Sequence, residues 1–152
     1  GGHRRLVREA VVREAARRGR RPAVRAPRLP ERPLSASADL LQQRPEQVRE
    51  VALRTMYVGD DHGWLGTTGG AAACERWLRA LGVALRTRDW RRAREATVDL
   101  RRRAVEAGGP VLELICLVDA VVRATAMAVT TGEAAELPRL GVALRRVAVE
   151  PG

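Results

Sequence analysis

Hydrophobic residues recur every three or four positions along most of the chain, with charged residues between them. That spacing puts the apolar side chains on one face of a helix, so it predicts amphipathic α-helices. No segment shows the strict alternation of apolar and polar residues typical of a strand, and no Asn-Gly or Asp-Gly hairpin signal occurs. We therefore expect an all-α fold. The predicted helices span residues 4–18, 38–43, 46–58, 71–86, 90–107, 110–130 and 137–147.

Two segments depart from the amphipathic pattern. Apolar residues occupy nearly every side of the helix expected at 110–130, which predicts a central, buried helix. Residues 59–70 form a polar connection that holds five glycines, together with Trp64 and Leu65. Because these two large apolar side chains are costly to expose to water, we expect the loop to fold back onto an apolar surface and to line a ligand site.

The basic charge is concentrated near the amino terminus. The 152 residues have a formal net charge of +10, and residues 1–34 contain eleven arginines against three glutamates. Four prolines between residues 20 and 33 disfavour regular structure there. We divide the chain into a basic amino-terminal helix with a Pro/Arg-rich linker, residues 1–34, and a helical domain, residues 35–152.

Composition narrows the functional classes. With 45% hydrophobic residues and no charge-free run of eighteen apolar residues, the chain is expected to be globular and to lack a membrane span. Its two cysteines lie in different segments, which argues against a disulfide framework and a structural zinc site and favours the cytoplasm. The amino-terminal arginines suit nucleic acid as a partner, but no aromatic residues are interleaved with them.

Candidate chemistry gathers between residues 57 and 77. Asp60, Asp61 and His62 are adjacent in the loop and can supply acid–base chemistry, or can simply form a turn. Cys74 and Arg76 follow at the start of a predicted helix, where the helix dipole and the guanidinium favour a thiolate or an anionic ligand. The alternative for Cys74 is a small, buried hydrophobic residue.

Aromatic residues are rare in this chain, and three of the four lie in the same region. They are Tyr57, Trp64 and Trp77. Such a cluster suits a flat hydrophobic ligand, although aromatic side chains also fill helical cores.

Four stretches from Thr68 onward follow an order found in a known family. They span residues 69–76, 99–110, 120–129 and 132–148. Together they resemble the phycobiliproteins and their non-photosynthetic relatives, the bilin-biosynthesis-associated globins. The resemblance covers roughly the last 85 residues. It implies a globin-like helical bundle over residues 35–152.

The same resemblance implies a tetrapyrrole site. In that family an Ala-Ala-Cys-x-Arg-Asp motif lies beside the chromophore, so Cys74 would form a thioether to a linear tetrapyrrole and Arg76 would pair with a propionate. The family's next residue, an Asp that binds the pyrrole nitrogens, is Trp77 here. Asp60 or Asp61 would substitute for it from the loop, or the ligand would be a macrocycle that needs no such carboxylate.

A second resemblance concerns residues 84–89 through 107–108 and on to 132–133. These stretches are similar to the helical cap of cobalamin-binding regulators. The Rossmann half that usually accompanies such a cap does not follow in this chain.

These observations lead to a functional hypothesis. We expect a cytoplasmic, non-catalytic, homodimeric protein that binds a biliverdin-type bilin, or alternatively haem, as a carrier, sensor or partner in tetrapyrrole metabolism. The alternatives are a cobalamin-cap-like regulator, an Arg-rich nucleic-acid or partner-binding module that uses residues 1–34, and an enzyme that uses Asp60, Asp61 and His62. The sequence alone leaves all of them open.

Overall fold

The computed structural model describes residues 29–59 and 61–150, and its regular elements are helices. The all-α prediction is confirmed, while the helix predicted at 4–18 lies outside the described residues. A 3-10 turn, η1 (Gly63–Gly66), precedes α4. The α-helices are α2 (Ser35–Gln43), α3 (Pro45–Met56), α4 (Thr68–Thr87), α5 (Trp90–Glu106), α6 (Val111–Ala128) and α7 (Thr131–Val149).

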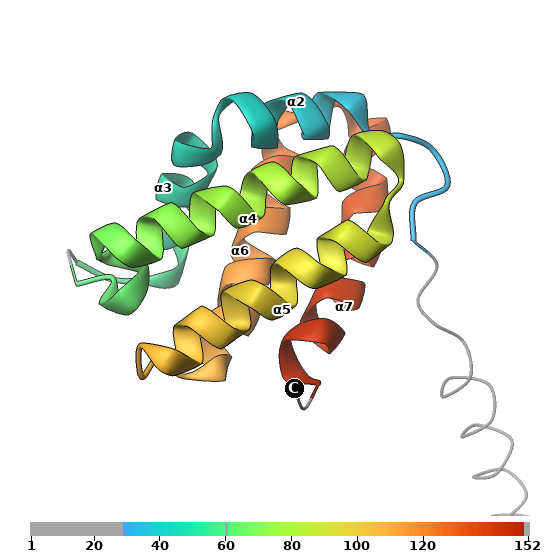
Figure 1. The fold of residues 1–152 in the computed structure, drawn as a ribbon. Coiled ribbons are helices and arrows are strands. Elements are labelled where there is room, and N and C mark those ends of the chain that lie inside the picture. Colours follow the sequence, from blue (N-terminus) through green and yellow to red (C-terminus); the bar gives the residue numbers. More distant parts are fainter. Residues whose placement is uncertain (1–28, 60, 151–152) are drawn as a thin grey trace, which may run out of the picture.

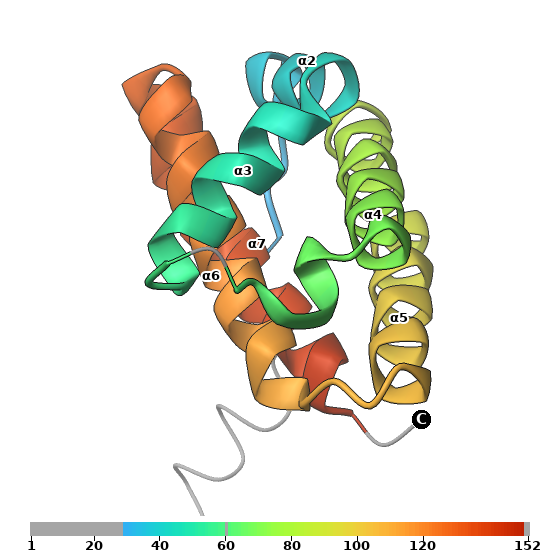
Figure 2. The ribbon, with the colours of Figure 1, turned by 90° about the vertical axis from the view of Figure 1, so that its left-hand side faces the viewer.

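Two antiparallel helix pairs face each other across one apolar core (Figures 1 and 2). One pair is α4 with α5, and the other is α6 with α7. α2 packs on α4 and α3 packs on α6, so these two short helices bridge the two pairs at one end. η1 packs against α4 near the other end (Figure 2).

Short polar side chains mark where α4 and α5 begin. Thr67 Oγ1 accepts a hydrogen bond from the Gly70 N–H at 3.1 Å, and Asp89 accepts one from the Arg92 N–H at 3.3 Å. Each cap satisfies a backbone donor that the first turn of a helix leaves free. Between the two helices, Arg88 adopts the left-handed conformation with φ 59°, which ends α4.

A buried hydrogen bond ties α4 to α5. The Trp77 Nε1–H donates to Thr97 Oγ1 at 3.0 Å, and Thr97 in turn donates to the Ala93 carbonyl at 2.8 Å. Both polar side chains are thereby satisfied inside the core, so neither leaves an unpaired buried group. Trp77 is 2% exposed and fills the core at the centre of α4.

Gly82 allows α2 and α4 to approach closely. A Cβ added at this position would lie 2.6 Å from Gln42 Cγ and 3.0 Å from the Ala38 carbonyl oxygen. Any side chain here would push the two helices apart, because one of these contacts is with backbone. Just beyond it, the Leu34 N–H donates to the Leu85 carbonyl at 3.1 Å and fixes the chain that enters α2.

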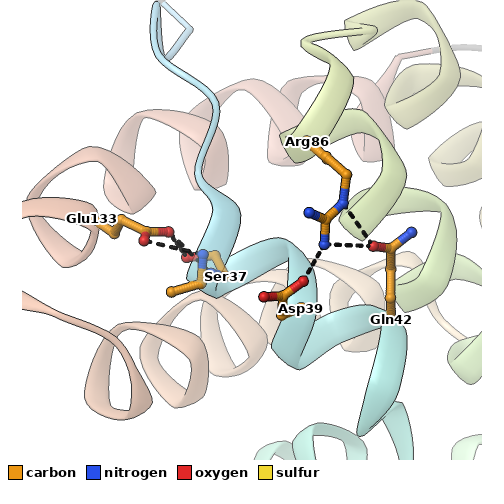
Figure 3. A network of polar contacts seen from close by, with 6 residues as sticks. Ser37, Asp39, Gln42, Arg86 and Glu133 are labelled. Carbon is orange, nitrogen blue, oxygen red and sulfur yellow. Dashed lines mark hydrogen bonds and ion pairs between the residues drawn. The ribbon is translucent and has the colours of Figure 1, made fainter.

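A carboxylate from the last helix caps the amino-terminal end of the first described helix. Glu133 in α7 accepts hydrogen bonds from the Ala36 N–H at 3.1 Å and from the Ser37 N–H and hydroxyl at 3.0 Å (Figure 3). α2 has no cap from its own flanking residue, so Glu133 supplies one across 96 positions of sequence. On the other side of α2, Arg86 binds Asp39 and Gln42 (Figure 3).

The structure differs from three sequence-based expectations about the helices. α6 is not buried on every side, because Leu112 and Met127 on its outer face are 68% and 86% exposed. The prediction that the helix at 110–130 is buried on every side is therefore wrong, although α6 does pack against α2, α3, α5 and α7. α7 begins at Thr131 rather than 137, because the helix includes Gly132 and continues through Pro138. α2 begins at Ser35 rather than 38.

Residues 29–34, assigned to the linker from the sequence, pack with the helical body. Leu34 is 3% exposed, Pro30 is fully buried, and Leu29 packs against the core. Within the described ranges, no helix is both long and apolar enough to cross a bilayer.

Removing the Glu133 carboxylate should destabilise the bundle. Glu133→Ala leaves two α2 backbone donors and the Ser37 hydroxyl without their partner, so we expect a loss of about 1–3 kcal/mol in the free energy of unfolding, measured by urea denaturation. Glu136→Ala, which removes a surface ion pair with Arg139 on the same helix, should cost less than about 1 kcal/mol. Equal stability losses in the two variants would show that the cap is unimportant.

Candidate functional site

Cys74 lies in the core of the bundle. Its side chain is 0% exposed, and burial raises the pKa of its thiol to about 12. The guanidinium that opposes this shift belongs to Arg49 of α3, which pairs with Glu75 at 3.2 Å. The expectation that the helix dipole and Arg76 favour a thiolate is therefore wrong, because desolvation outweighs every nearby positive charge.

Cys74, Arg76 and Trp77 do not form a common surface site. Arg76 is exposed on the outer face of α4, whereas Trp77 is buried beside Cys74 and bonded to Thr97. Residues two apart on a helix point in nearly opposite directions, and in this structure Cys74 faces the core while Arg76 faces solvent.

The loop that leads to α4 gathers four of the predicted residues, and Asp60 lies outside the described residues. Tyr57 and His62 stack with ring centroids 5.5 Å apart. A ring nitrogen of His62, Nε2, lies 3.2 Å from the Gly59 carbonyl oxygen, and Asp61 accepts from the Gly63 N–H at 3.1 Å. These are turn-forming contacts, so the loop is held by its own polar groups.

The expectation that this loop folds back is confirmed. Leu65 is 2% exposed, and Trp64 is partly buried against the core. The Trp64 carbonyl accepts from the Thr67 hydroxyl at 2.6 Å, which joins the loop to the start of α4. A Cβ on Gly70 would lie 1.9 Å from that carbonyl oxygen, so only glycine fits at this crossing.

Tyr57 carries a buried hydroxyl that finds no hydrogen-bond partner among the described residues. Burial and, after it, the nearby Glu113 carboxylate together raise the pKa of its phenol to about 12, although no contact of hydrogen-bond geometry joins Tyr57 to Glu113. Glu113 Oε1 lies 3.2 Å from the position that a Cβ on Gly63 would take, so this carboxylate faces the loop.

The predicted residues therefore fall in three separate places. Cys74 and Trp77 belong to the core, Arg76 to the outer face of α4, and Tyr57, Asp61, His62 and Trp64 to the loop. Within the ranges that the structure describes, no three His, Cys, Asp or Glu side chains gather as metal ligands.

A groove between α5 and α7 combines an apolar lining with charged side chains at its border, an arrangement that the predicted site residues do not form. It encloses about 470 Å³, within the range of about 300–1,000 Å³ typical of small-molecule sites. Its apolar lining, hereafter the floor of the α5–α7 groove, consists of Leu29, Trp90, Ala93, Leu140, Ala143, Leu144 and Val147. The two helices lie side by side in Figure 1.

Charged side chains border this floor from both helices. They are Arg91 and Arg94 of α5, Arg146 of α7 and Glu150. Arg94 pairs with Glu150 at 3.0 Å and Arg91 pairs with Glu95 at 3.0 Å, both in solvent. Arg146 is exposed and forms no ion pair within residues 29–59 and 61–150. The groove thus offers an apolar surface with guanidinium groups at its border.

The sequence contains signals for this groove, although none of the predicted site residues lines it. Trp90 stands at the start of an arginine-rich helix, and Leu140 and Leu144 are one turn apart on the last helix. What the sequence does not show is that α5 and α7 are neighbours, because the whole of α6 separates them along the chain.

Comparison of the chain with protein-family models, with curated proteins and with solved structures gave no match. The assignment of a function therefore depends on the site itself.

The two cysteines should differ sharply in reactivity. Cys116 is exposed and Cys74 is buried as a neutral thiol, so a thiol-specific reagent should modify one cysteine per folded chain and two in denaturant. In a Cys116→Ser variant the fast reaction should disappear. Rapid modification of Cys74 in that folded variant would contradict its burial.

Tyr57, the only tyrosine, should titrate late. Its pKa is raised from the ordinary value of 10.0 to about 12, so the neutral phenol is favoured in the folded state. The stability that this contributes is complete below pH 10 and is lost as the pH rises toward 12. In a pH titration of the folded protein, tyrosinate absorbance should reach half of its final value near pH 12. Glu113→Gln should lower the pH of that midpoint. A midpoint at the ordinary value, with helicity intact, would contradict the burial of the hydroxyl.

Proposed function

We propose that this protein binds a flat, apolar ligand that carries carboxylates, and that it binds this ligand in the α5–α7 groove without transforming it. Tetrapyrroles fit this description, and they are the class that the resemblance of the sequence implies. The proposal therefore keeps the ligand class, a biliverdin-type bilin or alternatively haem, and moves its site away from Cys74 and Arg76.

One observation supports this proposal above all others: the apolar floor is bordered by arginines from two helices. An aromatic or macrocyclic body would cover Leu140, Leu144 and the indole of Trp90. A carboxylate at the edge of the ligand would then accept hydrogen bonds from Arg146, which forms no ion pair in the described part of the chain.

Non-covalent binding fits this site better than a thioether. Cys74 is fully buried with a raised pKa, and it does not line the groove. The groove lining also contains no cysteine or histidine, so a haem bound there would lack an axial ligand from the lining residues. A linear tetrapyrrole, which needs no iron ligand, is the better match of the two.

The finer parts of the hypothesis remain part of the proposal. They are a globin-like arrangement of the helices, a cytoplasmic location and a homodimer. The exposed Val105, Val111 and Val149 border a second groove of about 540 Å³ and offer an apolar face for a second copy.

The alternatives have less support in the structure. Asp61 and His62 form hydrogen bonds within the turn. They therefore do not provide the free acid–base pair that the enzyme hypothesis requires. The arginines of residues 1–28 lie outside the described part, and most of those on α5 already pair with carboxylates. Neither nucleic acid nor cobalamin is favoured by a specific contact.

Spectroscopic titration with biliverdin, haem and cobalamin in turn tests the proposal. Ala143→Trp fills the groove and should abolish the spectral shift of the bound ligand, whereas Val142→Trp, at an exposed position outside the lining, should not. Arg146→Ala should weaken binding about tenfold, which corresponds to about 1.4 kcal/mol.

Arg76→Ala separates the groove from the site that the family resemblance implies. If Arg76→Ala weakens binding and Ala143→Trp does not, the ligand lies on α4 and the groove is the wrong site. If none of the three pigments changes its spectrum at about 10 μM protein, affinity near 1 μM or tighter is excluded and the proposal fails.

A further inference from the structure

The described chain starts inside the α5–α7 groove. Leu29 lines the groove beside Trp90 and Leu144, and Pro30 after it is fully buried. The Leu34 N–H bonded to Leu85 then fixes the path into α2. The preceding 28 residues are therefore attached at the groove itself, which gives them a high local concentration at its surface.

The sequence of that segment suits an apolar surface. Residues 4–18 carry Leu6, Val7, Ala10 and Val11 at helical spacing. An isolated helix of about 15 residues is only marginally stable in water, so a helix here needs a surface on which to bury this stripe. The floor of the α5–α7 groove is an apolar surface on which this stripe could be buried.

The apolar stripe, and not the whole predicted helix, matches the groove in length. A helix over residues 4–18 would be about 22 Å long, but its stripe from Leu6 to Val11 covers only about 8 Å. The lining residues Leu140 to Val147 of α7 extend over about 10 Å. The ten residues between the predicted helix and Leu29 reach at most about 36 Å when extended, enough for the helix to turn back along α7.

One carboxylate lies on the apolar face of the segment. Glu14 follows Ala10 by four residues and Val11 by three, which puts it in the middle of the predicted apolar stripe. A carboxylate there is unfavourable against a purely apolar surface, but Arg146 at the border of the groove forms no ion pair within the described ranges. Six arginines and two glutamates give residues 4–18 a net charge of +4, so the docking depends on the apolar stripe and on Glu14, and the remaining charge of the segment opposes it.

We propose that residues 4–18 dock in the α5–α7 groove of their own chain as an amphipathic helix, with Glu14 against the arginines at its border. The segment thereby competes with a ligand for the groove. Only this second statement rests on the proposed function, because the docking itself requires no ligand.

Disulfide trapping in the full-length chain tests the docking. In a Cys116→Ser background, Ala143→Cys provides a thiol in the groove, and the buried Cys74 stays unreactive. Its partner is Val11→Cys on the apolar face of the segment, or Glu9→Cys as a control on the opposite face, because residues two apart on a helix point in nearly opposite directions. Val142→Cys replaces Ala143→Cys as the control on α7, because Val142 is exposed and does not line the groove.

The expected result is an intramolecular disulfide that forms at least about tenfold faster for Val11→Cys with Ala143→Cys than for either control pair, since an undocked tether would bring both faces to the groove equally. Equal rates for all pairs would overturn the proposal. Disulfides found only between two chains would also overturn it, and would assign the groove to the segment of a second copy.

Biliverdin titration of full-length Glu14→Arg tests the competition separately. Repulsion from the groove arginines should release the segment, slow the trapping reaction about tenfold and raise biliverdin affinity. Trapping slowed without a change in biliverdin affinity would overturn the competition and keep the docking. If trapping succeeds while biliverdin binds no variant at all, the proposed function fails and the docking stands.

Discussion

The route by which the chain enters the bundle depends on the Glu133 carboxylate. By accepting three hydrogen bonds from Ala36 and Ser37, it joins the start of α2 to the start of α7. α2 can then lie along α4, and residues 29–34 before it are directed along the bundle to the end of the α5–α7 groove. A charge-assisted contact between the two ends of the described chain thus determines where the amino-terminal segment meets the body.

Much of the fold could be predicted from the sequence because helical periodicity is a local property. The α4–α5 pair is the clearest case, since Asp89 and the glycines after α5 mark its limits. The start of α7 was predicted six residues too late, because the helix includes Gly132 and also tolerates Pro138, at the cost of one backbone hydrogen bond. The apolar outer face of α6 misled the prediction as well, because composition does not tell burial from an exposed apolar surface.

The candidate site was less predictable, for a physical reason. Proximity in sequence suggested that Cys74 and Arg76 act together, but a separation of two residues turns their side chains to nearly opposite faces of the helix and leaves one in the core and the other in solvent. Trp90 and Arg146 share a groove only because α5 and α7 pack together. Contacts of this kind follow from tertiary packing, which no local pattern in a single sequence specifies.

The close contact at Gly82 restricts how this protein can evolve. Shortening Gln42 would remove the 2.6 Å approach to its Cγ, yet the 3.0 Å approach to the Ala38 oxygen is to main chain and would persist in every sequence that keeps this helix crossing. Drift elsewhere in α2 therefore cannot free position 82 to accept a side chain. A homologue with a larger residue there would have to cross α2 over α4 at a different distance or angle, and with it would change the route by which residues 29–34 reach the groove.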